Sequence, residues 1–337
     1  MGRLASVSPA TVSLVVNGIA SGRVSEKTQA RVRHWVEVLN YRVDGVARGL
    51  STGRRRMVAL VAPDITNPFF SNVAMGVAEV LGDESQLLLV VAGPGQGLLL
   101  ANVERVLALR VDAILVDSPS AALVRQLRPA CPMILLDAPG AQTSGWRVDF
   151  DLDAGAGALA DHLVSLGHRR IGYLDATSRS PTFRVRRSVI QSRLRAAGDS
   201  WALPVARSAV NLLAAADAFR RAWPRWSKAG VTAVACATDA QAYGVLQAAR
   251  ELGLRIPETI SVTGFDDLEY STAIQPPLTT VSLSGYELGM KAATLVRQIQ
   301  ERQVAAPHTE VIPTTLRVRS STGRAASPKG APVQAGS

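Results

Sequence analysis

Short apolar runs alternate with helical patterns through most of this chain, beginning at Met57 and continuing for about 260 residues. Strands are predicted at residues 57–62, 87–92, 113–116, 133–136, 170–174, 233–237 and 260–264. Helices are predicted between them, at residues 69–81, 101–109, 155–166, 186–197 and 241–252. Alternation of this kind forms right-handed βαβ units, in which helices cover both faces of a parallel sheet.

This α/β region is too long for one open sheet of ordinary size, because single cores rarely grow beyond roughly 250–300 residues. We therefore expect two Rossmann-like lobes. Apolar residues make up 47% of the sequence and charged residues 19%, which is enough apolar material for two cores. Ligands of such folds bind beyond the carboxyl ends of the strands, so a ligand site is expected between the lobes.

The first 56 residues have a different pattern, typical of short helices. Ser8 and Pro9 predict a helix start, because a serine hydroxyl caps free amides and proline suits the first helical position. Gly18 predicts its end. A second helix is expected after Ser25. A third helical candidate at residues 46–50 is too short to be stable alone, and residues 51–56 are expected to form a linker.

Basic residues are concentrated at the two ends of the chain. Residues 1–56 hold ten Lys and Arg against three acidic residues, which is +7 of the net +10. The segment from Arg317 onward adds +4, so residues 57–316 carry −1. A basic helical head on a neutral body is typical of a nucleic-acid-binding protein with a ligand-binding domain. A solvated basic terminus is the alternative from charge alone.

Other function classes receive little support. No apolar stretch approaches the ~18 residues that span a bilayer, and no export signal is evident, so a cytoplasmic protein is expected. Cys131 and Cys236 are expected to be buried thiols. The four histidines show no metal-binding spacing, and no catalytic motif occurs. The glycine-rich segment 93–97 lacks the third glycine of a dinucleotide loop. We therefore expect neither an enzyme nor a cofactor or metal site.

Several motifs together resemble the LacI/GalR family of bacterial transcription regulators. The head resembles it at Val7-Ser8-Pro9-Ala10-Thr11-Val12-Ser13 and at Leu39-Asn40-Tyr41. The body resembles it at Asp64-Ile65-Thr66-Asn67-Pro68-Phe69-Phe70, at Ile260-Ser261-Val262-Thr263-Gly264-Phe265-Asp266 and at Pro276-Pro277-Leu278-Thr279-Thr280. The motifs keep the family order from about residue 3 to residue 320.

The resemblance implies an α/β fold with an all-α helix-turn-helix head, incomplete here, and two parallel-sheet lobes of the periplasmic-binding-protein type I kind. It implies a head at residues 1–43 and a hinge helix with linker at 44–56. The effector-binding and dimerisation body is expected at 57–320, and a disordered tail at 321–337. Only Arg3-Leu4-Ala5 match the family's first helix. A start codon placed too late and a real truncation are competing explanations, and we expect weak operator binding that upstream residues would restore.

By resemblance, double-stranded operator DNA is the macromolecular partner. The family reads bases from positions matching Pro9, Ala10 and Leu14, and Leu14 replaces the usual arginine, so base preference is open. Thr11, Ser13 and Asn17 match positions that contact phosphates. Ser8 lies at the helix start, and Arg48 lies in the hinge. Leu50 matches a residue that wedges into a minor-groove step. The alternatives are packing of Leu14 against a dimer mate or the missing first helix, and of Leu50 onto the body.

The resemblance also implies a sugar-like effector between the lobes. The matching positions are Asn67, Phe69, Phe70, Arg186, Thr238, Asp239 and Asp266. Aromatic faces stack on sugar rings, and charged groups bond vicinal hydroxyls. Asp151 matches a family aspartate near the pocket, although Asn67 and Asp151 are equally well explained as helix caps. Trp146 and Phe183 are expected in loops that face the cleft, with core packing as the alternative.

These features predict a homodimeric DNA-binding regulator, most simply a repressor, whose operator affinity depends on the effector. Whether the effector induces or corepresses is open. A periplasmic-type sugar-binding protein without DNA binding is the alternative, since the body alone fits that function.

Overall fold

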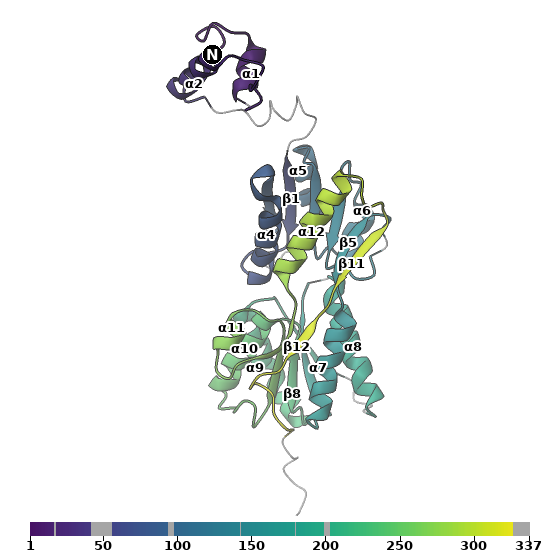
Figure 1. The fold of residues 1–337 in the computed structure, drawn as a ribbon. Coiled ribbons are helices and arrows are strands. Elements are labelled where there is room, and N and C mark those ends of the chain that lie inside the picture. Colours follow the sequence, from purple (N-terminus) through teal and green to yellow (C-terminus); the bar gives the residue numbers. More distant parts are fainter. Residues whose placement is uncertain are drawn as a thin grey trace, which may run out of the picture. The chain divides into compact units, whose positions relative to one another are not determined.

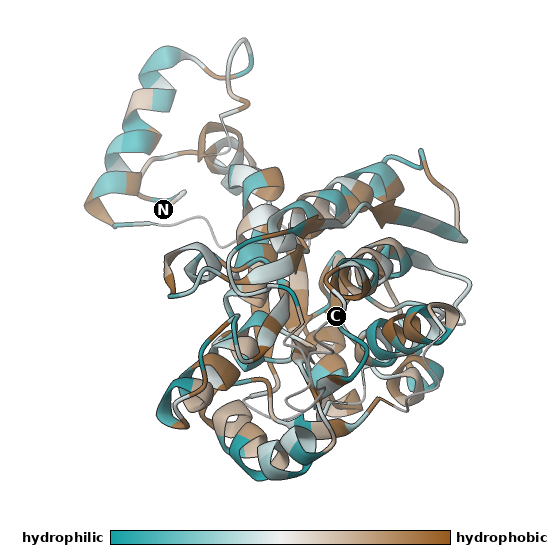
Figure 2. Cartoon of the chain, turned by 90° about the horizontal axis from the view of Figure 1, so that it is seen from below, coloured by the Kyte–Doolittle hydropathy of each residue, from teal (hydrophilic) through white to brown (hydrophobic). Residues whose placement is uncertain are grey.

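The computed structural model describes residues 1–16, 18–41, 56–93, 98–141, 143–178, 180–198 and 203–325. The chain divides into two compact units, Met1–Arg56 and Met57–Ser337. In both units the buried clusters are formed mainly by aliphatic side chains. Figure 2 shows that the helices of the body place hydrophilic residues on their outer sides and hydrophobic residues toward the sheets.

The first unit contains two helices, α1 (Pro9–Val16) and α2 (Glu26–Val38). Their starts are those predicted: the Ser8 hydroxyl accepts a hydrogen bond from the Thr11 amide at 3.1 Å, and the Ser25 hydroxyl caps α2. A small core holds the helices together, formed by Ala5, Val12, Val15, Ala20 and Val32. The predicted third helix at residues 46–50 lies outside the described residues.

The second unit contains two parallel-sheet lobes, and Figure 1 shows the N-terminal lobe above the C-terminal lobe. In the N-terminal lobe the strand order is β11-β5-β4-β3-β1-β2. Its strands are β1 (Met57–Ala62), β2 (Gln86–Val91), β3 (Ala113–Asp117), β4 (Met133–Leu136), β5 (Trp146–Phe150) and β11 (His308–Ile312). Its helices are α4 (Pro68–Leu81), α5 (Leu100–Ala108), α6 (Ala121–Gln126) and α12 (Gly285–Gln300), with a short 3₁₀ turn at Gly82–Glu84.

The C-terminal lobe repeats this arrangement, with strand order β12-β10-β9-β8-β6-β7. Its strands are β6 (Ile171–Ala176), β7 (Val205–Ser208), β8 (Ala233–Cys236), β9 (Ser261–Asp266), β10 (Thr279–Ser282) and β12 (Thr315–Arg317). Its helices are α7 (Leu152–Ser165), α8 (Pro181–Ala196), α9 (Leu212–Lys228), α10 (Asp239–Glu251) and α11 (Tyr270–Ala273). Only the β10–β12 pair is antiparallel among the described strands.

The chain passes between the lobes three times, after β5, after β10 and after β11. The second passage brings α12 back against α4 of the N-terminal lobe (Figure 1). Glycines allow this close approach: a Cβ on Gly289 would lie 2.1 Å from the Val73 carbonyl oxygen, and one on Gly76 would lie 2.1 Å from that of Tyr286. Segments far apart in sequence therefore pack closely together within the N-terminal lobe.

The seven predicted strands are all present, two of them with the predicted bounds, β1 and β4. The predicted elements do not include the strands β5, β7, β10, β11 and β12 or the helices α6, α9, α11 and α12. Residues 321–325, which were expected to belong to a disordered tail, are part of the folded body. Ser321 is fully buried, its hydroxyl donates to the Val262 carbonyl at 2.6 Å, and the Ala325 amide bonds the Leu166 carbonyl. Residues 326–337 lie outside the described residues.

Candidate functional site

The candidate DNA-contacting residues of the head lie on or next to α1. Ser8, Pro9, Ala10 and Ser13 are exposed, whereas Thr11 and Leu14 are half-buried. Leu14 packs partly against the core of the head itself. The Ser8 and Thr11 hydroxyls lie 2.9 Å apart and bond each other.

The first turn of α1 thus presents small, uncharged side chains. Such side chains allow close approach to a groove, with hydroxyl and amide donors for phosphates. Three further candidates, Asn17, Arg48 and Leu50, lie outside the described residues.

A cavity of about 150 Å³ lies between the two lobes of the body. Its walls are the segments that follow the carboxyl ends of parallel strands, where an α/β fold places its ligands. The N-terminal lobe contributes Pro63, Asp64, Thr66, Asn67, Phe70 and Ser118. The C-terminal lobe contributes Thr177, Ser178, Ser180, Phe183, Ala209, Val210 and Asn211. Two aromatic rings and several hydroxyl, amide and carboxylate groups line one small space.

Local turns fix several of these polar side chains. Asp64 Oδ1 accepts bonds from the amide and hydroxyl of Thr66 at 2.8 and 2.7 Å. Asn67 Oδ1 caps α4 by accepting from the Phe69 amide at 3.0 Å, so the helix-cap role considered from the sequence is present. Asn211 caps α9 in the same way. The groups are held rigidly, which lowers the entropy lost when a ligand binds.

A buried ion pair lies beside this cavity, on the C-terminal lobe. Arg186 of α8 is 3% exposed, and its Nη1 lies 3.5 Å from Asp266 Oδ1 and donates to the Ala237 carbonyl at 2.7 Å. The guanidinium also lies 5.3 Å from the ring centre of Phe183 and 4.6 Å from that of Phe265. Phe183 lines the cavity, so Arg186 and Asp266, both predicted to be effector residues, support the wall of the cavity from behind.

Two buried carboxyl groups of the N-terminal lobe face the same region. Burial, together with the neighbouring Asp137, raises the pKa of Asp117 to about 8. Burial also raises the pKa of Asp137 to about 6, while the Arg186 guanidinium acts in the opposite direction. The influence of Arg186 on Asp137 shows that polar groups of both lobes approach each other here.

Several of these buried polar atoms have no hydrogen-bond partner among the described residues. They are Asp117 Oδ2, Asp137 Oδ1, Ser180 Oγ, Arg186 Nε and Asp266 Oδ2. Unpaired buried polar atoms are costly and rare in folded proteins. Their convergence at one interlobe region indicates a site that a polar ligand would satisfy.

The backbone is strained at the same strand ends. Ser118, Asp137 and Asp266 have φ values of 48°, 45° and 119° and follow or end β3, β4 and β9. Non-glycine residues at positive φ cost about 1–3 kcal/mol each and gather at ligand sites.

Three predicted effector residues have other contacts. Phe69 is 6% exposed and packs in the N-terminal core beside Phe150. Thr238 caps α10. Asp239 accepts bonds from the Leu268 amide and from the hydroxyls of Ser271 and Thr280, at 2.9, 2.7 and 2.5 Å. Donors of its own lobe therefore occupy Asp239. Asp151 caps α7, as its alternative interpretation had it.

Asp64, Ser118, Ser180 and Asn211 also line the cavity, although they were not predicted to be effector residues. A usable signal was present, because each lies within a few residues after a strand or just before a helix. Polar residues at such positions converge once parallel strands align. β7 was not predicted, so Asn211 had no strand end to mark it.

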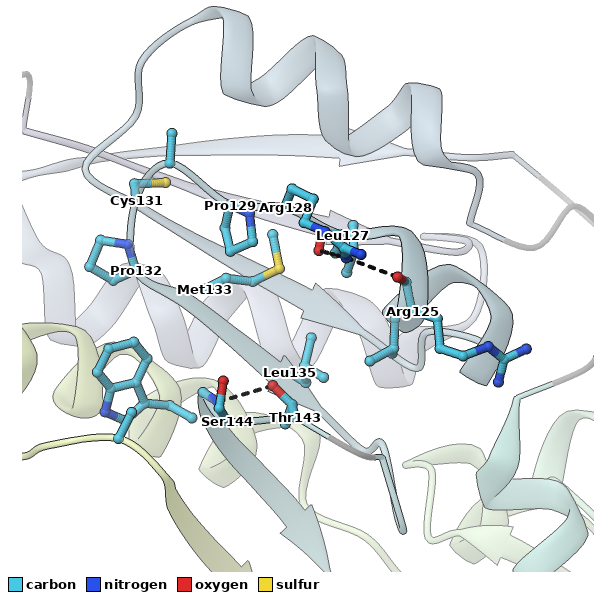
Figure 3. A pocket seen from close by; sticks show the side chains of 15 residues that line it. Arg125, Leu127, Arg128, Pro129, Cys131, Pro132, Met133, Leu135, Thr143 and Ser144 are labelled. Atoms are coloured by element: carbon cyan, nitrogen blue, oxygen red, sulfur yellow. Dashed lines mark hydrogen bonds between the residues drawn. The ribbon is translucent and has the colours of Figure 1, made fainter.

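A larger hollow of about 710 Å³ lies elsewhere on the N-terminal lobe, around the loop before β4 and the start of β5 (Figure 3). These are the amino ends of the strands, at the opposite edge of the sheet from the interlobe cavity. Trp146 lines this hollow, which places it away from the cleft. Cys131 also lines it and is half-buried rather than buried as expected, whereas Cys236 is buried.

Comparison with known families agrees with this division into head and body. Residues 2–44 match the model of bacterial regulatory proteins, lacI family. Residues 160–322 match the model of the periplasmic binding protein-like domain. The ribose operon repressor of Haemophilus influenzae is 30% identical over 88% of this chain and 90% of its own length.

The chain belongs to the LacI family of bacterial regulatory proteins. It is therefore a DNA-binding transcriptional regulator, and the alternative of a sugar-binding protein without a DNA-binding head is not supported.

Further relatives and solved structures cover nearly the whole chain. Catabolite control protein A of Priestia megaterium is 28% identical over 95% of this chain and 97% of its own. A transcriptional regulator CelR–cellobiose complex superimposes with a TM-score of 0.71 at 26% identity, covering 95% of this chain and 98% of that one. The lac repressor dimer bound to operator and the anti-inducer ONPF has a TM-score of 0.82 at 24% identity, covering 96% and 97%, and shows the shared fold.

Two further observations concern the described residues alone. No helix among them is both long and apolar enough to cross a membrane. They also contain no cluster of three or more His, Cys, Asp and Glu suited to a metal ion.

Proposed function

We propose that this regulator is a cytoplasmic, homodimeric repressor without enzymatic activity, whose operator affinity depends on a sugar-like effector bound between the lobes. The observation that carries the proposal is the interlobe cavity with its unpaired buried polar atoms, in a chain whose first unit is a LacI-type head. Relatives named for a ribose operon and a cellobiose complex support the class of effector.

For DNA, α1 is the element that enters the major groove. Pro9, Ala10 and Leu14 approach base edges, and the hydroxyls of Ser8, Thr11 and Ser13 approach phosphates. Asn17, Arg48 and Leu50 complete the proposed contact set. The net charge of +7 on residues 1–56 supplies the attraction that does not depend on sequence.

For the effector, Asn67, Phe70 and Phe183 contact the ligand directly, together with Asp64 and Asn211. Arg186 and Asp266 hold the wall behind Phe183 and carry the unpartnered atoms Arg186 Nε and Asp266 Oδ2. A polyol fits this set, because apolar ring faces meet aromatic rings and vicinal hydroxyls meet carboxylate, amide and guanidinium groups.

The two functions are linked through the lobes. A ligand that contacts both lobes favours one relative orientation of the lobes over another, and the three interlobe passages transmit that preference along the chain. Coupling of this kind typically amounts to 1–3 kcal/mol, or about 5–150-fold in operator affinity.

The DNA-binding part is tested with a pair of matched substitutions, Ala10→Asp on α1 and Ala30→Asp on α2. Both alanines are exposed helix residues of the head. A labelled duplex is first selected from a random pool with the wild-type protein, and binding is then followed by fluorescence anisotropy. We expect Ala10→Asp to weaken binding by about 10–100-fold, because a carboxylate would face phosphates and base edges, and Ala30→Asp to change it by less than about threefold.

Wild-type affinity should also fall steeply with salt, with a slope near −0.9 per neutralised phosphate. If no duplex is selected at low ionic strength, or if both variants bind equally well, the proposal for α1 is wrong.

The effector part is tested by thermal shift with a panel of sugars. Phe70→Ala should abolish the stabilisation that a binding sugar gives to the wild type. Met75→Ala is the control, because Met75 lies on the same helix and is 63% exposed. An unchanged response of Phe70→Ala would contradict the cavity as the effector site.

A further inference from the structure

A second hollow adjoins the interlobe cavity on the C-terminal lobe. Its volume is about 520 Å³, and it lies where β6 ends, α8 begins and β7 passes. Thr177, Ser178, Ser180 and Phe183 line both spaces. The cavity and the hollow therefore share part of their lining, and a ligand seated in the cavity lies next to the hollow.

Three arginines and one aspartate give this hollow its charge, Arg184, Arg187, Arg207 and Asp175. Arg187 donates to Asp175 Oδ2, and Arg207 Nε lies 3.7 Å from the same oxygen. Arg184 is exposed and forms no hydrogen bond or ion pair with any described residue. One carboxylate thus faces three guanidinium groups, which leaves an excess of two positive charges.

The N-terminus of α8 opens into the same hollow. Ser180 stands at the cap position, yet its hydroxyl makes no capping bond and has no partner, although the residue is only 6% exposed. The first turn of α8 contains no acidic residue. Free amides and a positive helix end attract anions. This observation points to an anion independently of the arginines.

We propose that the effector is a phosphorylated sugar, with its ring in the interlobe cavity and its phosphate in the hollow at the N-terminus of α8. The inference rests on the proposed function, because it assumes that the cavity holds a sugar-like effector. A phosphate ester carries −1.5 to −2 charge near pH 7 and three acceptor oxygens, which matches the excess charge, the Ser180 hydroxyl and the free amides. A carboxylate would neutralise only one of the two charges.

The closing experiment compares sugars with their own phosphate esters on the full-length protein. The probes are glucose and glucose 6-phosphate, ribose and ribose 5-phosphate, fructose and fructose 6-phosphate, and inorganic phosphate, at constant ionic strength. Glucuronate tests a carboxylate in place of phosphate. Binding is followed by thermal shift and titration calorimetry.

We expect at least one ester to bind tenfold or more tightly than its parent sugar. Inorganic phosphate should bind weakly and compete with that ester.

The matched variants lie on one helix and its neighbouring strand. Arg184→Gln combined with Arg207→Gln should weaken the ester by about 10–100-fold and leave the parent sugar unchanged. Arg195→Gln removes the same charge from an exposed position three turns further along α8 and should change nothing. Because all three arginines lie outside the head, the comparison also separates the hollow from phosphate binding by the basic head.

Three results would overturn the inference. The first is an ester that binds no better than its parent, the second is an unchanged affinity in the double variant, and the third is tighter binding of glucuronate than of any ester. If parent sugars still bind in a Phe70-dependent way, the proposed function stands while the phosphate site falls. If no probe binds at all, both are refuted.

Discussion

Replacing Arg186 with glutamine tests whether the buried ion pair holds the C-terminal wall of the cleft. The guanidinium is 3% exposed, bonds the Ala237 carbonyl and lies 3.5 Å from Asp266 Oδ1. Glutamine keeps a polar end but removes the charge and shortens the reach. Asp266, itself buried, then has no counter-charge in direct contact.

The expected cost follows from this geometry. Removing one partner of a buried pair typically destabilises a protein by about 3–5 kcal/mol, because the remaining charge is left in a poorly polarisable interior. Burial already raises the pKa of Asp266, while Arg186 lowers it. Without Arg186 the carboxyl keeps its proton to higher pH in the folded state than in the unfolded one. The cost of Arg186→Gln should therefore be smaller at pH 5 than at pH 8.

The assay is urea unfolding of the full-length protein, followed by tryptophan fluorescence at both pH values. A double-mutant cycle adds Asp266→Asn, which removes the charge that Arg186 compensates. We expect the double variant to be more stable than Arg186→Gln alone by about 2 kcal/mol or more at pH 8. Arg195→Gln, which changes an exposed arginine on the same helix, should stay within about 0.5 kcal/mol of the wild type.

Additive effects in the cycle, or a loss below about 1 kcal/mol at both pH values, would refute this reasoning. Either result would mean that the pair is hydrated or that another group compensates Asp266. Effector binding, measured by thermal shift, should fall with Arg186→Gln in parallel with the loss of stability.

Two other substitutions test the buried carboxyl group and the helix packing. Asp117→Asn should match the wild type near pH 4 and exceed it by about 4 kcal/mol near pH 7 in urea unfolding, because the raised pKa of about 8, against the ordinary 3.8, makes the wild type lose stability as pH rises between these values; an unchanged pH dependence would contradict this. Gly244→Ala should cost about 1–3 kcal/mol in the same assay, since the new Cβ would lie 2.2 Å from the Leu212 carbonyl oxygen. Gly157→Ala, which meets only the flexible end of Arg193, should be neutral or stabilising, and equal losses in both would show that packing is not the cause.

The sequence alone determined the parts of the structure that depend on local pattern. Continuous apolar runs predicted β1 and β4 with their observed bounds, because strands buried on both faces need apolar residues at every position. Ser8 and Ser25 predicted the two helix starts of the head, since capping involves only the next three residues. Ordered motifs predicted the family, and the segregation of charge agreed with it.

Tertiary structure alone decided which residues share the site. Phe69 and Phe70 are adjacent in sequence, yet Phe69 enters the core and Phe70 lines the cavity. Asp64 and Asn211 come together although 147 positions separate them, because two sheets align their carboxyl ends across the cleft. The missed strands β7, β10 and β12 are short and rich in polar residues, so they are recognisable only through pairing with distant partners. Local periodicity fixes an element, whereas a binding site depends on long-range closure that no local pattern records.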